Sequence, residues 1–278
     1  NISDLPQMPK LLDGANYAKL YNEAFGSENY SQEYIRNLES NVNRFLYPNV
    51  DWFNQIFKKW SDGVNAALSI RGGGERARYF INMDYLGDNG NLKDYKTNDY
   101  DSNIHVHRYN FRSNIDITVT KSTTINLEIG ANLTDMHEPG VGNESIYSTY
   151  LRSPAEELFY WAYLSSPLSC PVQLPIEYGE NGDVTKWGWG APSQVGEKNP
   201  MERLMGSGYN TRFNTEVMTQ LVLTQDLSFL TKGLNFKGFF SFDSNSYNTQ
   251  FRQKTSSTYS VGGIDDETGQ IITKEVDK

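Results

Sequence analysis

The sequence predicts an all-β protein that forms an antiparallel segment of a transmembrane β-barrel. Three features support this fold class: strict alternation of apolar and polar residues, unusually long strands, and an alternation of short and long connections between them. Residues 108–120 show the alternation best. One face carries Tyr109, Phe111, Ile115, Ile117 and Val119, and the other carries Arg108, Asn110, Arg112, Asn114, Asp116 and Thr118. A soluble strand has about 5 to 6 residues and a tilted bilayer-crossing strand about 9 to 11, so this segment is long enough to cross a membrane.

The composition agrees with a β-protein and excludes some partners. Aromatic residues make up 13% of the 278 residues, and the chain has 23 glycines. A net charge of -9 argues against nucleic acid as a partner. The chain has no run of 18 apolar residues, which excludes a transmembrane helix, whereas barrel strands give a much weaker hydropathy signal. Cys170 is the single cysteine, so we expect a semi-buried thiol in a loop and no intramolecular disulfide.

The first part of the chain, residues 1–64, is expected to be an external loop region with short helices, early in the barrel domain. Residues 17–25 and 32–38 have helical spacing, as do Trp52, Ile56 and Trp60. Asn1 is not followed by a basic and apolar leader, which predicts either a cytoplasmic chain or an interior or mature piece of a longer precursor.

Barrel strands are expected over 65–278, with a period of two that first appears at Asn65. The predicted short turns are 72–75, 121–123 and 226–233, and the predicted long external loops are 87–103 and 135–210. This regular exchange of short and long connections is typical of outer-membrane barrels. We therefore expect 108–120 to run from an external loop to a periplasmic turn, with Tyr109 and Ile117 toward lipid. Burial of Ile115 and Ile117 in a closed core would contradict this interpretation.

Several segments, in this order, resemble barrel motifs of the SusC-like (RagA-like) TonB-dependent outer-membrane transporters. They are 17–24, Asp51-Trp52, 65–79, 108–116, Asn199-Pro200, 207–209 and 225–234. The resemblance implies a barrel of about 22 strands around a plug domain, in a Gram-negative outer membrane. It also implies a SusD-like surface lipoprotein as lid, energy from TonB, and import of oligosaccharides or peptides.

The chain would supply about 7 to 8 of those strands, since each crossing needs about 9 to 11 residues plus its loops. The plug domain is absent from this chain and is expected before Asn1, together with the segment that contacts TonB; the remaining strands are expected after Lys278. Because open sheet edges are not tolerated in lipid, the chain is expected to pair with the remainder of its own barrel.

Two groups of residues are candidate substrate contacts. Arg108, Arg112 and Asp116 share the polar face of one strand, where they would line the transport path or contact the plug, or simply form the polar interior that any barrel has. Trp187 and Trp189, with Tyr178 and Tyr160, could stack on sugar rings or peptide side chains. The alternative for the aromatic group is loop packing or contact with the lid.

Metal binding and catalysis have weaker support. His105 and His107 could chelate a metal, but no third ligand is evident in the sequence, so a solvated pair is expected. Residues 88–94 and 180–183 resemble pieces of calcium loops without EF-hand spacing; turns are expected, with structural calcium left open and no other cofactor.

Neither a nucleophile elbow nor a zinc-protease motif occurs, and the adjacent carboxylates at 156–157 and 265–267 do not define a hydrolase site. We expect a non-enzyme. Two alternatives to an importer stay open: a secreted or surface β-sandwich that binds glycans through Trp187 and Trp189, and a passive porin-like channel.

Overall fold

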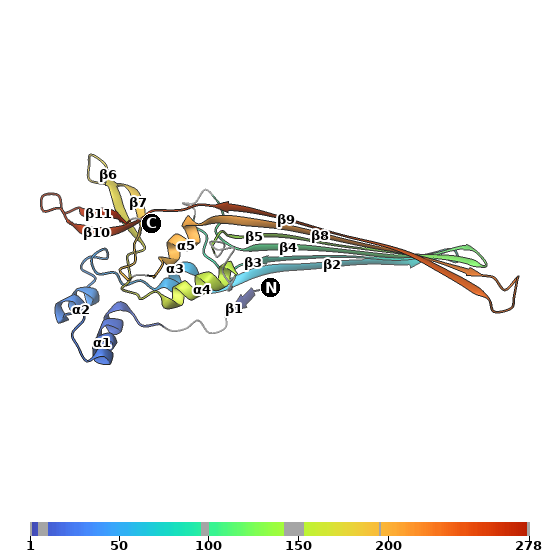
Figure 1. Cartoon of the computed structure of the whole chain (residues 1–278), viewed down its shortest axis with the longest axis horizontal. Helices are drawn as coiled ribbons and strands as arrows, with labels where there is room; N and C mark the ends of the chain where they lie inside the picture. Colours follow the sequence, from blue (N-terminus) through green and yellow to red (C-terminus); the bar gives the residue numbers. More distant parts are fainter. Residues whose placement is uncertain (1, 5–10, 96–99, 142–152, 195, 277–278) are drawn as a thin grey trace.

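A computed structural model describes residues 2–4, 11–95, 100–141, 153–194 and 196–276. Parts of the two predicted external loops, 96–99, 142–152 and residue 195, lie outside the described residues. The strands form a large antiparallel sheet and a smaller second sheet (Figure 1). In spatial order, the strands of the large sheet are β1 (Ile2–Asp4), β2 (Trp60–Gly73), β3 (Ala77–Asn89), β4 (His105–Thr120), β5 (Thr123–Pro139), β8 (Gly208–Asp226) and β9 (Asn235–Gln253).

The register of the large sheet divides its side chains between one apolar and one polar face. Because strand side chains alternate with period two, each rung of paired residues places all its side chains on one face. One apolar rung consists of Tyr79, Ile115, Leu127, Leu221 and Phe240. One polar rung consists of Asp84, Asn110, Asn132, Glu216 and Asn245. The alternation predicted for 108–120 is therefore confirmed and extends across β3, β4, β5, β8 and β9.

Protein does not cover the apolar face. Apart from Pro139 at the loop end of β5, none of the described aliphatic or aromatic side chains of β2, β3, β4, β5, β8 and β9 is buried. Ile117 is 38% exposed, and Ile115 is half-buried. Soluble proteins rarely leave a contiguous apolar surface of this kind in contact with water. The result that would have contradicted a membrane-facing strand, burial of both isoleucines in a closed core, is not found.

The connections between long strands differ at the two ends of the sheet, as predicted. Residues 74–76, 121–122 and 227–234 make the short turns, and 90–104 and 140–207 make the long connections. All helices and the second sheet gather at the end with the long connections (Figure 1). We call these helices, the second sheet and the segments that join them the loop assembly.

Among the described residues, the loop assembly contains five helices: α1 (Gly14–Phe25), α2 (Gln32–Glu39), α3 (Trp52–Ile56), α4 (Pro154–Leu164) and α5 (Pro200–Gly206). The first three confirm the helices expected before residue 64. Each begins at a side chain that caps its free amides: Asp13, Ser31 and Asp51 accept hydrogen bonds from backbone N–H groups. Among the described helices, none has the length and apolarity needed to cross a bilayer.

Trp60 departs from the expected helical spacing and starts β2, so the first long strand begins before Asn65. Helix α3 ends at Ile56, and Phe57 then takes an extended conformation and forms a β-bridge with Leu92. This pairing turns the chain out of the helix. Helical spacing of aromatic residues alone could not reveal it, because the partner lies in a distant loop.

The second sheet contains four short strands that were not expected to pair. Its order is β11 (Ile271–Val276), β10 (Thr258–Ile264), β7 (Val184–Gly190) and β6 (Gln173–Tyr178). The strand pattern near Tyr259 was expected to continue the barrel wall, whereas β10 leaves the large sheet and pairs in parallel with β7. The amide of Ala191 donates to the carbonyl of Tyr259 at 2.7 Å, which extends this contact.

The main buried core lies in the loop assembly. Residues from α3, α4, α5 and the neighbouring segments form it: Trp52, Phe53, Ile56, Phe57, Leu92, Val141, Leu158, Ala162, Cys170, Met201, Leu204 and Met205. Asn199 joins α5 to the second sheet: its Oδ1 accepts from the Met201 and Glu202 amides, and its Nδ2 donates to the carbonyls of Val172 and Gly190 at 3.1 and 2.9 Å. The loop assembly is thus a packed unit.

Replacement Asn199→Ala should lower the free energy of unfolding of the loop assembly by about 1–3 kcal/mol, because it removes a helix cap and the two side-chain hydrogen bonds to the carbonyls of Val172 and Gly190. Urea unfolding followed by tryptophan fluorescence measures this loss. The exposed Asn54→Ala serves as the control and should change the free energy by less than about 0.5 kcal/mol. Equal effects of the two substitutions would contradict the bridging role of Asn199.

Cys170 should resist alkylation while the protein is folded. It is 1% exposed, and burial raises the pKa of its thiol to about 12, so the reactive thiolate is scarce at pH 8. Mass spectrometry after iodoacetamide treatment should find unmodified Cys170 in native protein and complete modification in urea. Rapid labelling of the native protein would show that this part of the core is open.

Candidate functional site

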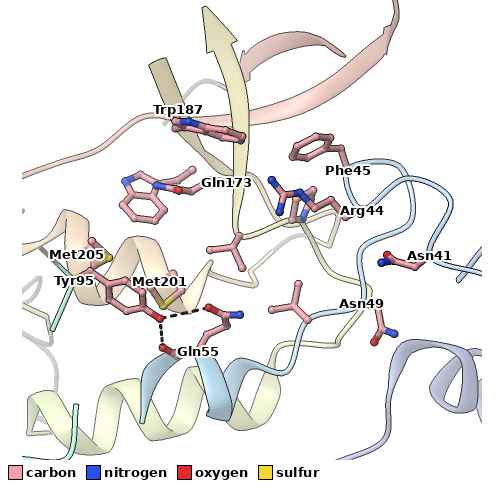
Figure 2. Close-up of a pocket in the computed structure, with 14 residues that line it drawn as sticks. Asn41, Arg44, Phe45, Asn49, Gln55, Tyr95, Gln173, Trp187, Met201 and Met205 are labelled. Carbon is pink, nitrogen blue, oxygen red and sulfur yellow. Dashed lines mark hydrogen bonds between the residues drawn. The ribbon is translucent and has the colours of Figure 1, made fainter. Parts of the chain in front are cut away.

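A cleft of about 450 Å³ opens in the loop assembly (Figure 2). One wall is formed by β6 and β7, the base by α3 and α5, and the rim by residues 41–50. Figure 2 shows Trp187 on one side of the cleft and Arg44 and Phe45 facing it. Four separate parts of the sequence, including Tyr95, therefore meet at one concave surface, as is usual for ligand sites.

Strand β7 places both tryptophans on the cleft side. Trp187 and Trp189 alternate with Gly188 and Gly190, so the glycines occupy the opposite face of the strand. A Cβ atom at Gly190 would lie 2.0 Å from the carbonyl oxygen of Pro171, and one at Gly188 would lie 2.4 Å from the ring of Tyr259. The glycines therefore allow the chain to pack closely behind the wall. Trp189 is partly buried against the main core, whereas Trp187 is 42% exposed.

The rim is held in place by Asn43. Its Oδ1 accepts hydrogen bonds from the amides of Phe45 and Leu46 at 2.9 and 3.3 Å. This turn places the guanidinium of Arg44 4.9 Å from the centre of the Phe45 ring and 6.0 Å from that of Trp187. Both distances are within the range of cation–π contact, so the arginine lies beside a fixed aromatic pair.

The base of the cleft combines hydrogen-bonding groups with apolar side chains. The Tyr95 hydroxyl donates to the backbone carbonyl of Gln55 at 2.6 Å, and Figure 2 shows this contact beside Met201 and Met205. Burial raises the pKa of Tyr95, so its hydroxyl stays protonated as this donor at neutral pH. Gln55 thereby has a fixed position at the base.

The chemistry of the lining favours binding over catalysis. Of the described residues around the cleft, Arg44 alone carries a formal charge at neutral pH. Carboxamides at Asn41, Asn49, Gln55 and Gln173 supply hydrogen-bond donors and acceptors, and the tryptophans supply flat apolar surface. Such a lining can hold a polar ligand, but it contains no carboxylate pair for acid–base chemistry among these residues.

The predicted aromatic group is only partly brought together. Trp187 and Trp189 line the cleft, while Tyr178, from the same sheet, is not among the lining residues. The Tyr178 hydroxyl accepts from the amide of Ile271 at 2.9 Å and so links β6 to β11. Tyr160 packs edge-to-face on Trp161 in α4, with ring centroids 5.1 Å apart. Sequence proximity suggested a common role for these four residues, whereas tertiary pairing separates them.

Arg108, Arg112 and Asp116 lie elsewhere, on the polar face of β4 in the large sheet. All three are exposed, and Asp116 accepts a hydrogen bond from Asn126 at 2.5 Å. They do not line the cleft. Their placement on the face opposite the apolar one agrees with the alternation, and their contact with a substrate or plug stays a prediction.

The histidines expected to form a solvated pair have protein partners. His105 contacts Asn89 at 2.7 Å and Asp101 at 2.5 Å, and Nδ1 of His107 lies 2.9 Å from the Tyr85 hydroxyl. No cluster of three or more metal-ligating side chains is present within the described ranges. Residues 180–183 belong to the turn between β6 and β7.

The adjacent carboxylates serve local structure. Glu156 completes a capping box with Ser153 at the start of α4, and Glu157 accepts from the Trp161 indole at 2.5 Å. Asp265 accepts from the amide and hydroxyl of Thr268, both at 2.8 Å, in the turn before β11. These contacts explain the residues without a catalytic role.

Sequence reasoning missed the rim. Arg44, Phe45 and Asn49 lie in a polar segment between two helices, and nothing local distinguishes them as ligand contacts. The Asn43-Arg44-Phe45 turn provides a weak signal, because asparagine commonly caps a turn that presents the residues after it. Their contact with Trp187 is long-range and required the fold.

Known proteins resemble this chain in sequence and in fold. No family model matches the chain. TonB-dependent receptor P26 of Formosa agariphila is 24% identical over 173 residues, which covers 60% of this chain and 16% of that receptor. The chain is a distant homologue of TonB-dependent receptors. It spans less than a fifth of the length of this curated relative.

Two solved structures share the fold of this TonB-dependent receptor homologue. They are the structure of the RagAB peptide importer in the "closed-closed" state and the structure of the RagAB peptide transporter. Each matches with a TM-score of 0.55 and 14% identity, over 89% of this chain and 27% of the matched chain. The likeness shows that the sheet and loop assembly recur together in a larger protein.

Replacement Gly190→Ala should destabilise the cleft wall by about 1–3 kcal/mol, because the new methyl group meets backbone atoms that cannot move aside easily. Thermal unfolding and the rate of limited proteolysis between β6 and β7 measure the effect. Gly262→Ala is the matched control, since its Cβ would have its nearest neighbour at 3.5 Å. Equal stability of the two variants would show that the wall is loosely packed.

Proposed function

We propose that this chain forms part of the wall and external loops of a SusC-like, TonB-dependent importer in a Gram-negative outer membrane. The uncovered apolar face of the large sheet is the observation that carries the proposal. Lipid is the solvent in which such a face is stable, and the homology to a TonB-dependent receptor names the class of barrel.

The height of the apolar face supports this proposal. On β4 it runs from Tyr109 to Val119, which is about 33 Å along the strand at about 3.3 Å per residue. A tilt of about 45° reduces this to about 23 Å across a membrane. Outer-membrane barrels have an apolar band about 25 Å tall, so the two heights agree.

At the end nearest the loop assembly, the apolar face of the large sheet finishes in aromatic and then polar side chains, as expected at a membrane–water interface. Tyr85 and Tyr109 face each other there, with ring centroids 5.1 Å apart. On the same face, the next rung toward the loop assembly contains His107 and Asp135. Aromatic girdles followed by polar side chains mark the membrane–water interface in barrels of this class.

Two edges of the sheet support its placement in a larger barrel. β9 pairs with β8 alone, and most of β2 pairs with β3 alone, among the strands that the structure describes. Unpaired amides and carbonyls are not tolerated in hydrocarbon. Further strands of the same barrel would satisfy both edges. The polar face, with Arg108, Arg112 and Asp116, would then line the lumen around a plug.

The partners and cargo of this importer follow from the same proposal. A SusD-like surface lipoprotein would cover the loop assembly, and TonB would act through a plug domain. The cargo would be an oligosaccharide or a peptide. A β-sandwich receives less support, because the second sheet does not bury the apolar face of the first. The receptor homology favours an energised importer over a passive channel.

A charge-placement experiment tests the membrane-facing surface. Leu221 and Gln220 are neighbours on β8 with opposite orientations: Leu221 belongs to the apolar rung and Gln220 to the polar face. Leu221→Arg should cost about 2–4 kcal/mol of stability in the membrane, whereas Gln220→Arg should be tolerated. The measurements are the yield in the outer-membrane fraction and the heat-modifiable gel mobility of the full-length protein.

The same two arginine variants also test the alternative of a water-soluble protein. For a sheet exposed to water, arginine at either exposed position would leave stability and solubility almost unchanged. Recovery of the full-length protein as a soluble species, with equal behaviour of the two variants, would reject the proposed membrane location.

A further inference from the structure

We propose that the cleft binds an oligosaccharide that carries carboxylate groups, with Arg44 as the residue that recognises the acid. This inference rests on the proposed function, because it names the cargo class of the same importer. The alternative cargo, a peptide, uses different chemistry and becomes an outcome of the test.

Charge is the first argument. The chain has a net charge of -9, yet the one ionised group among the described cleft residues is a cation. No described carboxylate forms an ion pair with Arg44, and its guanidinium instead makes cation–π contacts with the rings of Phe45 and Trp187. Arg44 lies beside these two rings, and its planar guanidinium offers a fork of N–H donors that matches a carboxylate.

The shape of the wall is the second argument. Trp187 presents an exposed indole to the cleft, and its ring is tilted by 39° to that of Phe45 at a centroid distance of 6.2 Å. A sugar ring has a flat apolar C–H face that packs on such a ring, while its hydroxyl groups point outward. Trp189 continues the same side of β7 deeper into the cleft, where it contacts the core.

The carboxamides are the third argument. Asn41 and Gln173 lie near the rim and wall, and Gln55 lies at the base. Each amide offers both donors and an acceptor, which suits hydroxyl groups that also do both. A peptide would instead need a row of backbone partners or a deep side-chain pocket. Of the described residues of β6, Gln173 alone lines the cleft, so the cleft offers too little strand edge for strand addition.

Calorimetric titration of the purified full-length receptor tests the inference. The probes are tetragalacturonate, tetramannuronate and a hyaluronan tetrasaccharide, with cellotetraose as the neutral sugar and an uncharged hexapeptide as the peptide. At least one acidic probe should bind about tenfold or more tightly than cellotetraose, as expected for a charge-assisted hydrogen bond. Its affinity should also fall as salt is raised.

Three variants assign the binding to the cleft. Arg44→Gln should weaken the acidic probe about tenfold or more and leave weak cellotetraose binding unchanged. Trp187→Ala should weaken both sugars. Arg36→Gln, on an exposed position of α2 outside the cleft, is the matched control and should bind as wild type.

The outcomes separate this inference from the proposed function. The protein could be found in the outer membrane with heat-modifiable mobility and yet bind no acidic probe, or bind one with an affinity that Arg44→Gln does not change. Either result would overturn the acidic cargo and leave the proposed importer intact. Binding of the hexapeptide in place of the sugars, lost in Trp187→Ala, would assign a peptide and also overturn it. Absence of the protein from the outer membrane would contradict the proposed importer function itself.

Discussion

The antiparallel hydrogen-bond register of the six long strands is the constraint on which the other features depend. Each rung places its side chains on one face, so a slip of one residue on any strand would move its apolar set to the polar side. Tyr79, Ile115, Leu127, Leu221 and Phe240 share a rung through four separate pairings. The uncovered apolar surface exists because all these pairings agree. The same pairings set the positions from which both long connections leave the sheet.

The loop assembly follows a different principle, since it has a buried hydrophobic core of its own. Trp52, Leu158 and Leu204 belong to this core, and all its buried members lie outside the long strands. This separation lets the two parts meet different solvents: the strands present apolar side chains outward, and the loop assembly places them inward. A rigid loop assembly can hold Arg44 and Trp187 in fixed positions. Binding then does not require the loops to be ordered first, which lowers its entropic cost.

Sequence alone predicted the features that depend on local periodicity. The long strands from Tyr79 to Phe242 and the helices near Tyr17 and Ile35 follow from spacings of two and 3.6 residues. The second sheet could not be predicted, because Pro175 and Gly188 interrupt its short strands and the pairing of β7 with β10 is long-range and parallel. Trp187 and Trp189 were recognisable as aromatic residues in a long loop. Arg44 became a candidate only when folding placed it beside Trp187.

The pairing of β7 with β10 also has a consequence for the order in which parts of the fold can be completed. Trp189 lies beside Thr258, and the whole β8–β9 hairpin is made between them. The tryptophan wall is therefore complete only when the β8–β9 hairpin has returned the chain to the loop assembly. The shape of the cleft wall thus depends on completion of this section of the sheet. A molecule whose hairpin fails to assemble would have the cleft residues without the cleft.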